Sequence, residues 1–125
     1  MPRILVCDDN ALMIRTIEFC LKSEGYEVIT ATDGHRADEY LRNRGQSVDL
    51  VITDLLLPYM SGLELINLIR LHYHLDMPVI VLTKAYNDAL RQQALEMGAN
   101  EFIAKPVDPG VLSLLVNKLI TNRQR

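Results

Sequence analysis

The sequence predicts an α/β fold in which five helices cover both faces of a five-stranded parallel sheet. Short apolar runs alternate along the chain with amphipathic stretches that are long enough for helices. The run Val51–Thr53 is apolar on both faces, which is typical of a strand buried on both sides of a parallel sheet. Right-handed crossovers with one reversal of strand order then give a doubly wound sheet of order 2-1-3-4-5.

The first two strands and helices follow from apolar spacing and from residues that begin or end helices. Strands are predicted at Arg3–Cys7 and Glu27–Ala31, each a short apolar run. Asn10 is suited to cap the first helix and Gly25 to end it, while Gly45 ends the second. The inward faces are expected at Met13, Ile17, Cys20 and Leu21 in the first helix and at Ala37, Tyr40 and Leu41 in the second.

The third strand is predicted at Asp49–Thr53, directly before Asp54. Ser61 and Glu64 then form an S-x-x-E capping box, which predicts the start of the third helix. The apolar positions of this helix are Leu65, Ile66 and Ile69.

The fourth strand, Val79–Leu82, ends on Thr83, and the shorter fifth strand, Glu101–Ala104, ends on Lys105. A helix that begins at residue 87 or 88 is expected to stop at Gly98. Residues 121–125 are polar and are expected to fray. The last helix is expected to present Leu112, Leu115, Val116 and Leu119 at helical spacing.

The totals are those of an ordinary globular chain, so we expect residues 1–125 to form a single domain. A net charge of -3 and a pI of about 5.5 predict no direct binding of nucleic acid. Cys7 and Cys20 are expected to be small buried hydrophobes rather than a disulfide or a metal pair. The acidic start MPRILVCDD does not resemble a signal peptide, and no apolar run approaches a membrane span. We therefore expect a soluble, cytoplasmic protein that does not contact a membrane.

Polar side chains stand at the carboxyl ends of four predicted strands, and they are Asp8, Asp9, Asp54, Thr83 and Lys105. Because these ends lie on one edge of a parallel sheet, we expect three carboxylates, a hydroxyl and an ammonium to share a pocket. Like charges so close need a proton or a cation between them, and hard oxygen ligands suit Mg²⁺ better than Zn²⁺. Such a pocket suits a phosphoryl group, for which Asp54 can itself be the nucleophile.

This set of residues resembles the receiver domain of two-component response regulators, of the chemotaxis-regulator type. The resemblance covers the chain from residue 3 to about residue 122, in the order and at the spacings of that family. It implies a flavodoxin-like fold that catalyses only its own phosphorylation and hydrolysis. It also implies a histidine kinase or a phosphotransfer protein as phosphodonor, and a downstream protein target or an output domain. The motifs that carry the resemblance are Asp8-Asp9, Asp54-x-x-x-Pro58, Thr83 and Lys105-Pro106.

The resemblance implies a role for each residue of the expected pocket. Asp54 would accept the phosphoryl group, and Lys105 would pair with its oxygens. Asp9, Asp54 and the backbone carbonyl of Leu56 would bind Mg²⁺, or Mn²⁺ in its place. Asp8 would act mainly through bound water.

The resemblance also implies a switch that reports phosphorylation. Thr83 would move to hydrogen-bond the phosphoryl oxygens, and Phe102 would move inward behind it. The added charge would in this way change the surface of the fourth helix, fifth strand and fifth helix, where a partner would bind.

Three residues depart from the family pattern. Lys84 follows Thr83 where a small residue is common, and we hypothesise that its long side chain restricts access of water or a phosphatase and lengthens the phosphorylated lifetime. Val107 stands where one large class of transcription factors often has Phe, which weakens assignment to that class. Leu57 replaces a frequent Met.

Three other functions remain open from the sequence. A phosphohydrolase of the haloacid-dehalogenase type carries a second acid two residues after its nucleophile, where this chain has Leu56, and Leu cannot act as a general acid or base. A flavodoxin-like cofactor binder needs a Ser-, Thr- or Gly-rich phosphate loop where this chain has Asp8 and Asp9. A receiver-like scaffold independent of phosphorylation is disfavoured by the complete set of polar residues.

Overall fold

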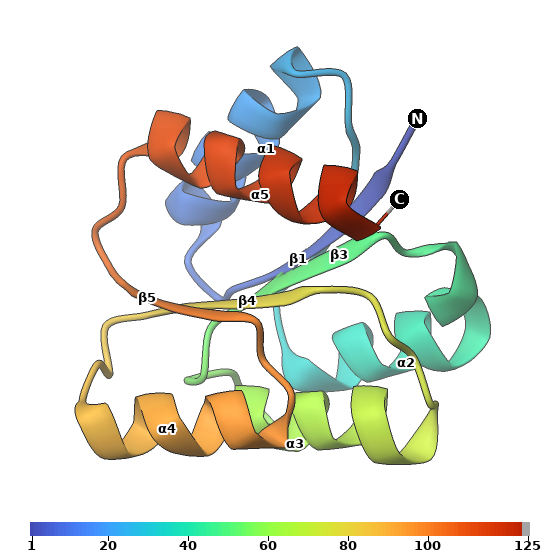
Figure 1. Ribbon diagram of the computed structural model, residues 1–125, viewed down its shortest axis with the longest axis vertical. Helices are drawn as coiled ribbons and strands as arrows, with labels where there is room; N and C mark the ends of the chain where they lie inside the picture. Colours follow the sequence, from blue (N-terminus) through green and yellow to red (C-terminus); the bar gives the residue numbers. More distant parts are fainter. Residues whose placement is uncertain (124–125) are drawn as a thin grey trace.

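A computed structural model describes residues 1–123, and a five-stranded parallel sheet forms its centre (Figure 1). The strand order is β2-β1-β3-β4-β5, and every neighbouring pair is parallel. The predicted fold class and strand order are therefore confirmed. The strands are β1 (Arg3–Cys7), β2 (Glu27–Ala31), β3 (Leu50–Thr53), β4 (Val79–Thr83) and β5 (Glu101–Ala104).

Helices cover both faces of the sheet, with α1 and α5 on one face and α2, α3 and α4 on the other (Figure 1). Alternate residues of the central strands pack into the two layers, since Val51 joins the cluster under α2–α4 and Ile52 joins the cluster under α1 and α5. The helices are α1 (Ala11–Ser23), α2 (Gly34–Arg44), α3 (Gly62–Asn67), α4 (Asp88–Met97) and α5 (Pro109–Arg123), with a short 3₁₀-helix η1 (Gly45–Ser47) and a π-helix η2 (Leu68–His72).

Short polar side chains begin four of the helices, because each accepts a backbone N–H that the first turn leaves unpaired. The predicted caps Asn10, Ser61 and Asn87 accept from Met13, Glu64 and Leu90 at 3.0, 3.2 and 2.8 Å. Asp33 does the same for α2, accepting from Arg36 at 2.8 Å. Gly98, at φ 118°, ends α4 in the left-handed conformation that glycine adopts without steric cost.

Several boundaries and faces differ from the sequence prediction. β3 begins at Leu50, one residue later than predicted, and the carboxylate of Asp49 accepts the backbone N–H of Arg3 at 2.7 Å. Ile14 is buried in α1, whereas Met13 and Cys20 are only partly buried. Ile17 and Leu21 are buried as predicted, and Ile14 joins them in place of Met13 and Cys20.

The end of the chain also differs from prediction. Residues 121–123 continue α5 instead of fraying, while 124 and 125 lie outside the described residues. Arg123 holds this end, because its guanidinium donates to Asp76 Oδ1 at 2.9 Å and to the carbonyl of Asp49 at 3.2 Å. Within residues 1–123, no helix has the length and apolar character needed to cross a membrane.

Candidate active site

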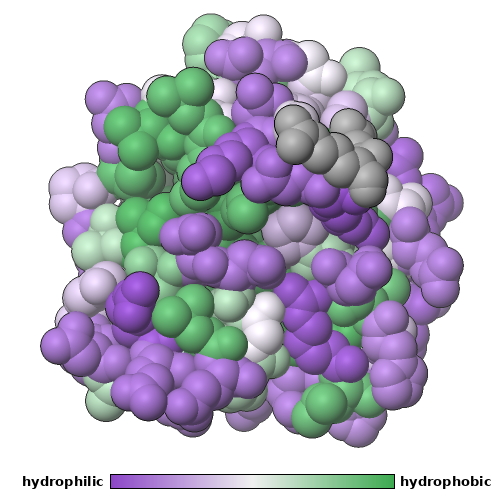
Figure 2. All heavy atoms as spheres, viewed as in Figure 1, coloured by the Kyte–Doolittle hydropathy of each residue, from purple (hydrophilic) through white to green (hydrophobic). Residues whose placement is uncertain are grey.

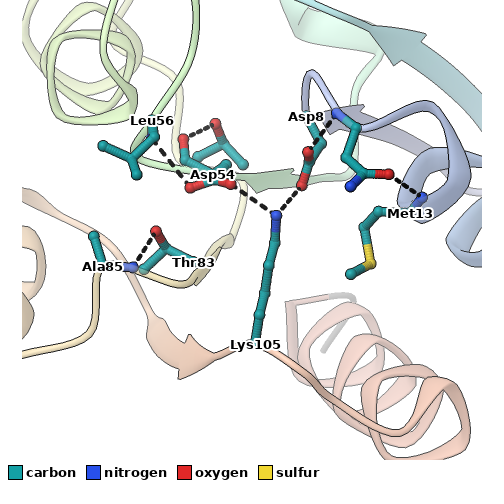
Figure 3. Close-up of polar contacts among 9 residues, drawn as sticks. Asp8, Met13, Asp54, Leu56, Thr83, Ala85 and Lys105 are labelled. Carbon is teal, nitrogen blue, oxygen red and sulfur yellow. Dashed lines mark hydrogen bonds and ion pairs between the residues drawn. The ribbon is translucent and has the colours of Figure 1, made fainter.

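A buried ion-paired cluster lies at the carboxyl edge of the sheet (Figure 3). The Nζ of Lys105, which follows β5, lies 2.5 Å from Oδ2 of Asp8 and 2.7 Å from Oδ2 of Asp54. Asp8 follows β1 and Asp54 follows β3, whereas Lys105 follows β5. The Lys105 side chain therefore reaches past the end of β4 to pair with both acids. All three side chains are at most 7 % exposed, and buried charges persist only when they are paired in this way.

The pairing sets the charge of the cluster. Burial disfavours the carboxylate of Asp54, but the Lys105 ammonium, the backbone N–H of Leu56 and the hydroxyl of Thr83 together hold its pKa below the usual value. Burial likewise disfavours the ammonium, yet hydrogen bonds to Asp54 and Asp8 raise the pKa of Lys105. Asp54 is therefore ionised at neutral pH.

Three backbone contacts fix the position of Asp54. Its N–H donates to the carbonyl of Cys7 at 3.0 Å, which continues the ladder between β1 and β3. Its Oδ1 accepts the N–H of Leu56 at 3.0 Å. A Cβ on Gly62 would lie only 2.2 Å from the Asp54 carbonyl oxygen, so the start of α3 can approach this closely only with glycine.

Asp8 and Asp9 take different positions. Asp8 is buried, and its Oδ1 accepts the N–H of Asn10 at 2.9 Å, which ties it to the start of α1. Asp9 is exposed and lies at a bend of the loop between β1 and α1. Asp9 thus lies outside the buried pair of acids, and within residues 1–123 no group of three His, Cys, Asp or Glu side chains is placed to share a metal ion.

The expected switch residues lie beside the cluster. Thr83 is fully buried, and its hydroxyl accepts the N–H of Ala85 at 3.1 Å (Figure 3). Phe102 is buried, and its ring lies 5.3 Å from that of Tyr86 at an angle of 59°. Lys84 is exposed. The sequence prediction missed Tyr86, although an aromatic residue three positions after Thr83 was a signal that could have identified it.

The donor atoms at this edge fit a magnesium ion. Mg²⁺ takes one or two carboxylates and keeps several waters, so Asp54, one further carboxylate at this edge and nearby backbone carbonyls suffice. The one thiol nearby is that of Cys7 in β1, and its burial in the core raises its pKa to about 12. A neutral thiol is not a metal ligand, and the site therefore offers oxygen alone.

Residues 4–117 match the family described as the response regulator receiver domain. The chain belongs to this family. Its receiver domain is 37 % identical to the response regulator GtcR of Aneurinibacillus migulanus over 106 residues, which are 85 % of this chain and 42 % of that protein. The chain spans about half the length of the curated relatives it matches.

Solved structures agree with this membership. A receiver domain protein from Clostridium thermocellum superimposes with a TM-score of 0.90 at 31 % identity, covering 99 % of this chain and 98 % of that one. CheY in a CheX–CheY–BeF₃–Mg²⁺ complex from Borrelia burgdorferi superimposes with a TM-score of 0.87 at 27 % identity, covering 94 % of this chain and 87 % of that one. This chain is thus a two-component receiver domain, and receiver domains as a class bind Mg²⁺ and work with a kinase.

Proposed function

We propose that this receiver domain accepts a phosphoryl group on Asp54 from a histidine kinase or a phosphotransfer protein, in a Mg²⁺-dependent reaction. The observation that carries the proposal is the buried carboxylate of Asp54, kept ionised by the Lys105 ammonium 2.7 Å away. We further propose that residues 1–125 act as one receiver unit.

In the proposed reaction, a carboxylate oxygen of Asp54 attacks the phosphorus of a phosphohistidine. A P–O bond forms as the P–N bond breaks, and the imidazole leaves with the bonding electron pair. Lys105 stands where it can pair with the phosphoryl oxygens as their charge grows. Asp9, Asp54 and the Leu56 carbonyl would hold Mg²⁺, with Asp8 acting mainly through bound water. The ion supplies charge neutralisation during transfer.

We propose that the phosphoryl group is read through Thr83. Its hydroxyl accepts the N–H of Ala85 and keeps its own hydrogen to donate to a phosphoryl oxygen, so a movement of Thr83 toward that oxygen would carry the loop before α4 with it. Phe102 in β5 follows through its contact with Tyr86 in the same loop. The changed surface of α4, β5 and α5 then binds a downstream protein or an output domain.

An exposed apolar surface on α1 and α5 supports the proposal that the phosphodonor is a protein. Figure 2 shows apolar side chains gathered at the upper left of the view, where α5 begins, whereas the surface over α4 is largely polar. Leu12 of α1 and Val111 and Leu114 of α5 are 75, 57 and 72 % exposed. A groove of about 290 Å³ between these helices is lined in part by Val107 and Pro109. We propose that the phosphodonor contacts this surface.

The test is incubation with acetyl phosphate and Mg²⁺, followed by intact-mass measurement. The wild-type protein should gain one phosphoryl group, the Asp54→Asn variant should gain none, and Asp88→Asn, which changes an exposed acid of α4, should behave as wild type. A gain that persists in Asp54→Asn, or the absence of any gain, would overturn the proposal. Multiple turnover of unrelated phosphate esters would favour a phosphohydrolase instead.

A further inference from the structure

The first turn of α2 supports the loop that follows Asp54. The N–H of Gly34 donates to the carbonyl of Pro58 at 3.0 Å. A Cβ on Gly34 would lie 2.4 Å from the Cβ of Met60 and 2.5 Å from its carbonyl oxygen. Such distances are below those of real contacts, so this part of the loop can lie against α2 only because residue 34 has no side chain.

The need for glycine comes from the loop and not from the backbone of α2. Gly34 is the first residue of α2, and its φ is not among the positive values found at Gly25 and Gly98. An alanine there would meet no conformational strain and would favour the helix on its own. The whole cost of such a substitution therefore falls on the contact with Met60.

The loop itself is tightly folded at this contact. Met60 donates its N–H to the carbonyl of Pro58 at 2.8 Å, and Tyr59 between them has a φ of 70°. The ring of Tyr59 meets that of His35 edge-on, with centroids 5.6 Å apart. Two successive residues of α2, Gly34 and His35, thus contact three successive residues of the loop.

Residues 58–60 lie only a few residues after Asp54, so their placement can affect its carboxylate. Leu56, two residues before Pro58, donates the N–H that Oδ1 of Asp54 accepts at 3.0 Å. On the far side, Gly62 donates its N–H to the carbonyl of Leu55 at 2.9 Å. The loop is thus fixed at both ends by contacts near Asp54, and its middle is fixed by Gly34.

We propose that Gly34 is a positioning residue for the phosphorylation site, acting through the loop on the Asp54 carboxylate and on the backbone of Leu56. The inference rests on the proposed function for its consequence, because the Leu56 carbonyl is there a ligand of Mg²⁺. In the Gly34→Ala variant, the new methyl group pushes residues 58–60 away from α2 and moves Leu56 with them. Changes to groups that orient a ligand lower metal affinity by about 10- to 100-fold.

The experiment compares Gly34→Ala with Gly110→Ala in the unphosphorylated protein. Gly110 lies in the first turn of α5, where a Cβ would meet only Oδ1 of Asp108 at 3.2 Å. Mn²⁺ binding, followed by electron paramagnetic resonance, should weaken at least tenfold in Gly34→Ala and remain unchanged in Gly110→Ala. Amide exchange at Leu56 should become faster in Gly34→Ala alone, because its bond to Asp54 is disturbed.

A second variant addresses the origin of the effect and a possible failure to fold. A Cβ on residue 34 would meet both the Cβ and the carbonyl oxygen of Met60, and Met60→Gly removes the first of these contacts. The double variant Gly34→Ala/Met60→Gly should therefore recover part of the lost Mn²⁺ affinity. If Gly34→Ala is unfolded, the double variant is measured against Met60→Gly alone and should still bind more weakly.

The outcomes separate this inference from the proposed function. Unchanged Mn²⁺ affinity together with unchanged Leu56 exchange in Gly34→Ala overturns the role of Gly34, even if Asp54 is phosphorylated. A wild-type protein that does not bind Mn²⁺ overturns the proposed function, while faster Leu56 exchange in Gly34→Ala would still support the positioning of Asp54.

Discussion

The ammonium nitrogen of Lys105 lies 2.7 Å from Oδ2 of Asp54, and both side chains are at most 7 % exposed. Lys105 also pairs with Asp8, so one buried cation serves two buried anions. Removal of the cation leaves like charges together without solvent, which is more costly than loss of a surface pair. The stability of the domain and the reactivity of its site consequently depend on the same three side chains.

The Lys105→Met variant should be less stable at neutral pH by about 3 kcal/mol, because Asp8 and Asp54 lose the buried ammonium with which both are paired. Urea unfolding without divalent cations measures the loss. The loss should shrink as the pH falls, because a proton can then replace the cation, and it should also shrink in the double variant with Asp54→Asn. The exposed Lys118→Met serves as control, and equal stability of both variants would contradict the prediction.

Burial of Cys7 predicts a loss of stability at alkaline pH. Burial raises the pKa of its thiol from 9.0 to about 12, so the folded state resists an ionisation that the unfolded state allows. The stabilisation is complete below pH 9 and is lost as the pH rises from 9 toward 12. Relative to Cys7→Ala, the wild-type protein should lose about 1.4 kcal/mol between pH 8 and pH 10. A constant difference in urea unfolding over this range would show that the thiol ionises equally in both states.

Substitution of Arg70 should lower the stability of the domain far more than substitution of Arg123, although both arginines make several hydrogen bonds. Its half-buried guanidinium donates to the carbonyls of Gly98 and Leu75 at 2.9 and 2.8 Å and to the side chain of Asn100 at 3.2 Å. Arg70→Gln should cost about 2 kcal/mol, because two partly buried carbonyls lose their donors.

Arg123 provides the matched comparison for this prediction. It pairs with Asp76, whose side chain is 91 % exposed, so Arg123→Gln should change stability by less than about 0.5 kcal/mol. Both variants are measured by urea unfolding, and hydrogen exchange at residues 98–100 should accelerate only in Arg70→Gln. Equal effects of the two substitutions would contradict the distinction.

The topology and the main parts of the site could be predicted from the sequence because both follow from periodicity. Apolar runs of strand length fixed the five strands, and a parallel sheet places all their carboxyl ends on one edge. Asp8, Asp54 and Lys105 meet for this reason alone. Helix starts at Asn10 and Asn87 were likewise predictable, because capping depends on neighbours within one turn.

Features that depend on side-chain direction or on distant partners could not be predicted. Asp9 turns outward next to Asp8, although the two residues are identical in type. The third helix passes into a π-helix, where Arg70 reaches a carbonyl 28 residues further along the chain. The contact between Gly34 and Met60 has no pattern in the sequence, since it joins α2 to a loop more than twenty residues away and depends on Gly34 having no Cβ.

The hypothesis about Lys84 stays a prediction, with one structural basis. The side chain is exposed and follows the buried Thr83 directly, so it is free to lie over the opening of the site. Lys84→Ala should shorten the lifetime of phosphorylated Asp54 several-fold, because water reaches the acyl phosphate more easily. The decay of the phosphorylated mass with time measures this rate. Arg91→Ala changes an exposed cation on α4 and serves as the control. Equal decay rates in the two variants would show that Lys84 does not set the phosphorylated lifetime.

The Tyr86–Phe102 pair makes a prediction about the switch. Tyr86 is 44 % exposed and covers a buried Phe102, so the Tyr86→Ala variant leaves the Phe102 ring without its outer contact. An aromatic pair contributes about 0.5–1.5 kcal/mol, which corresponds to a shift of about 2- to 10-fold between two ring positions. NMR shifts of residues 101–104 in unphosphorylated Tyr86→Ala should therefore move toward those of the phosphorylated wild type. Phe19→Ala removes a 78 % exposed aromatic of α1 and should leave these shifts in place. Shifts that move in a direction unrelated to phosphorylation would indicate that Tyr86 only packs against Phe102 and does not bias the switch.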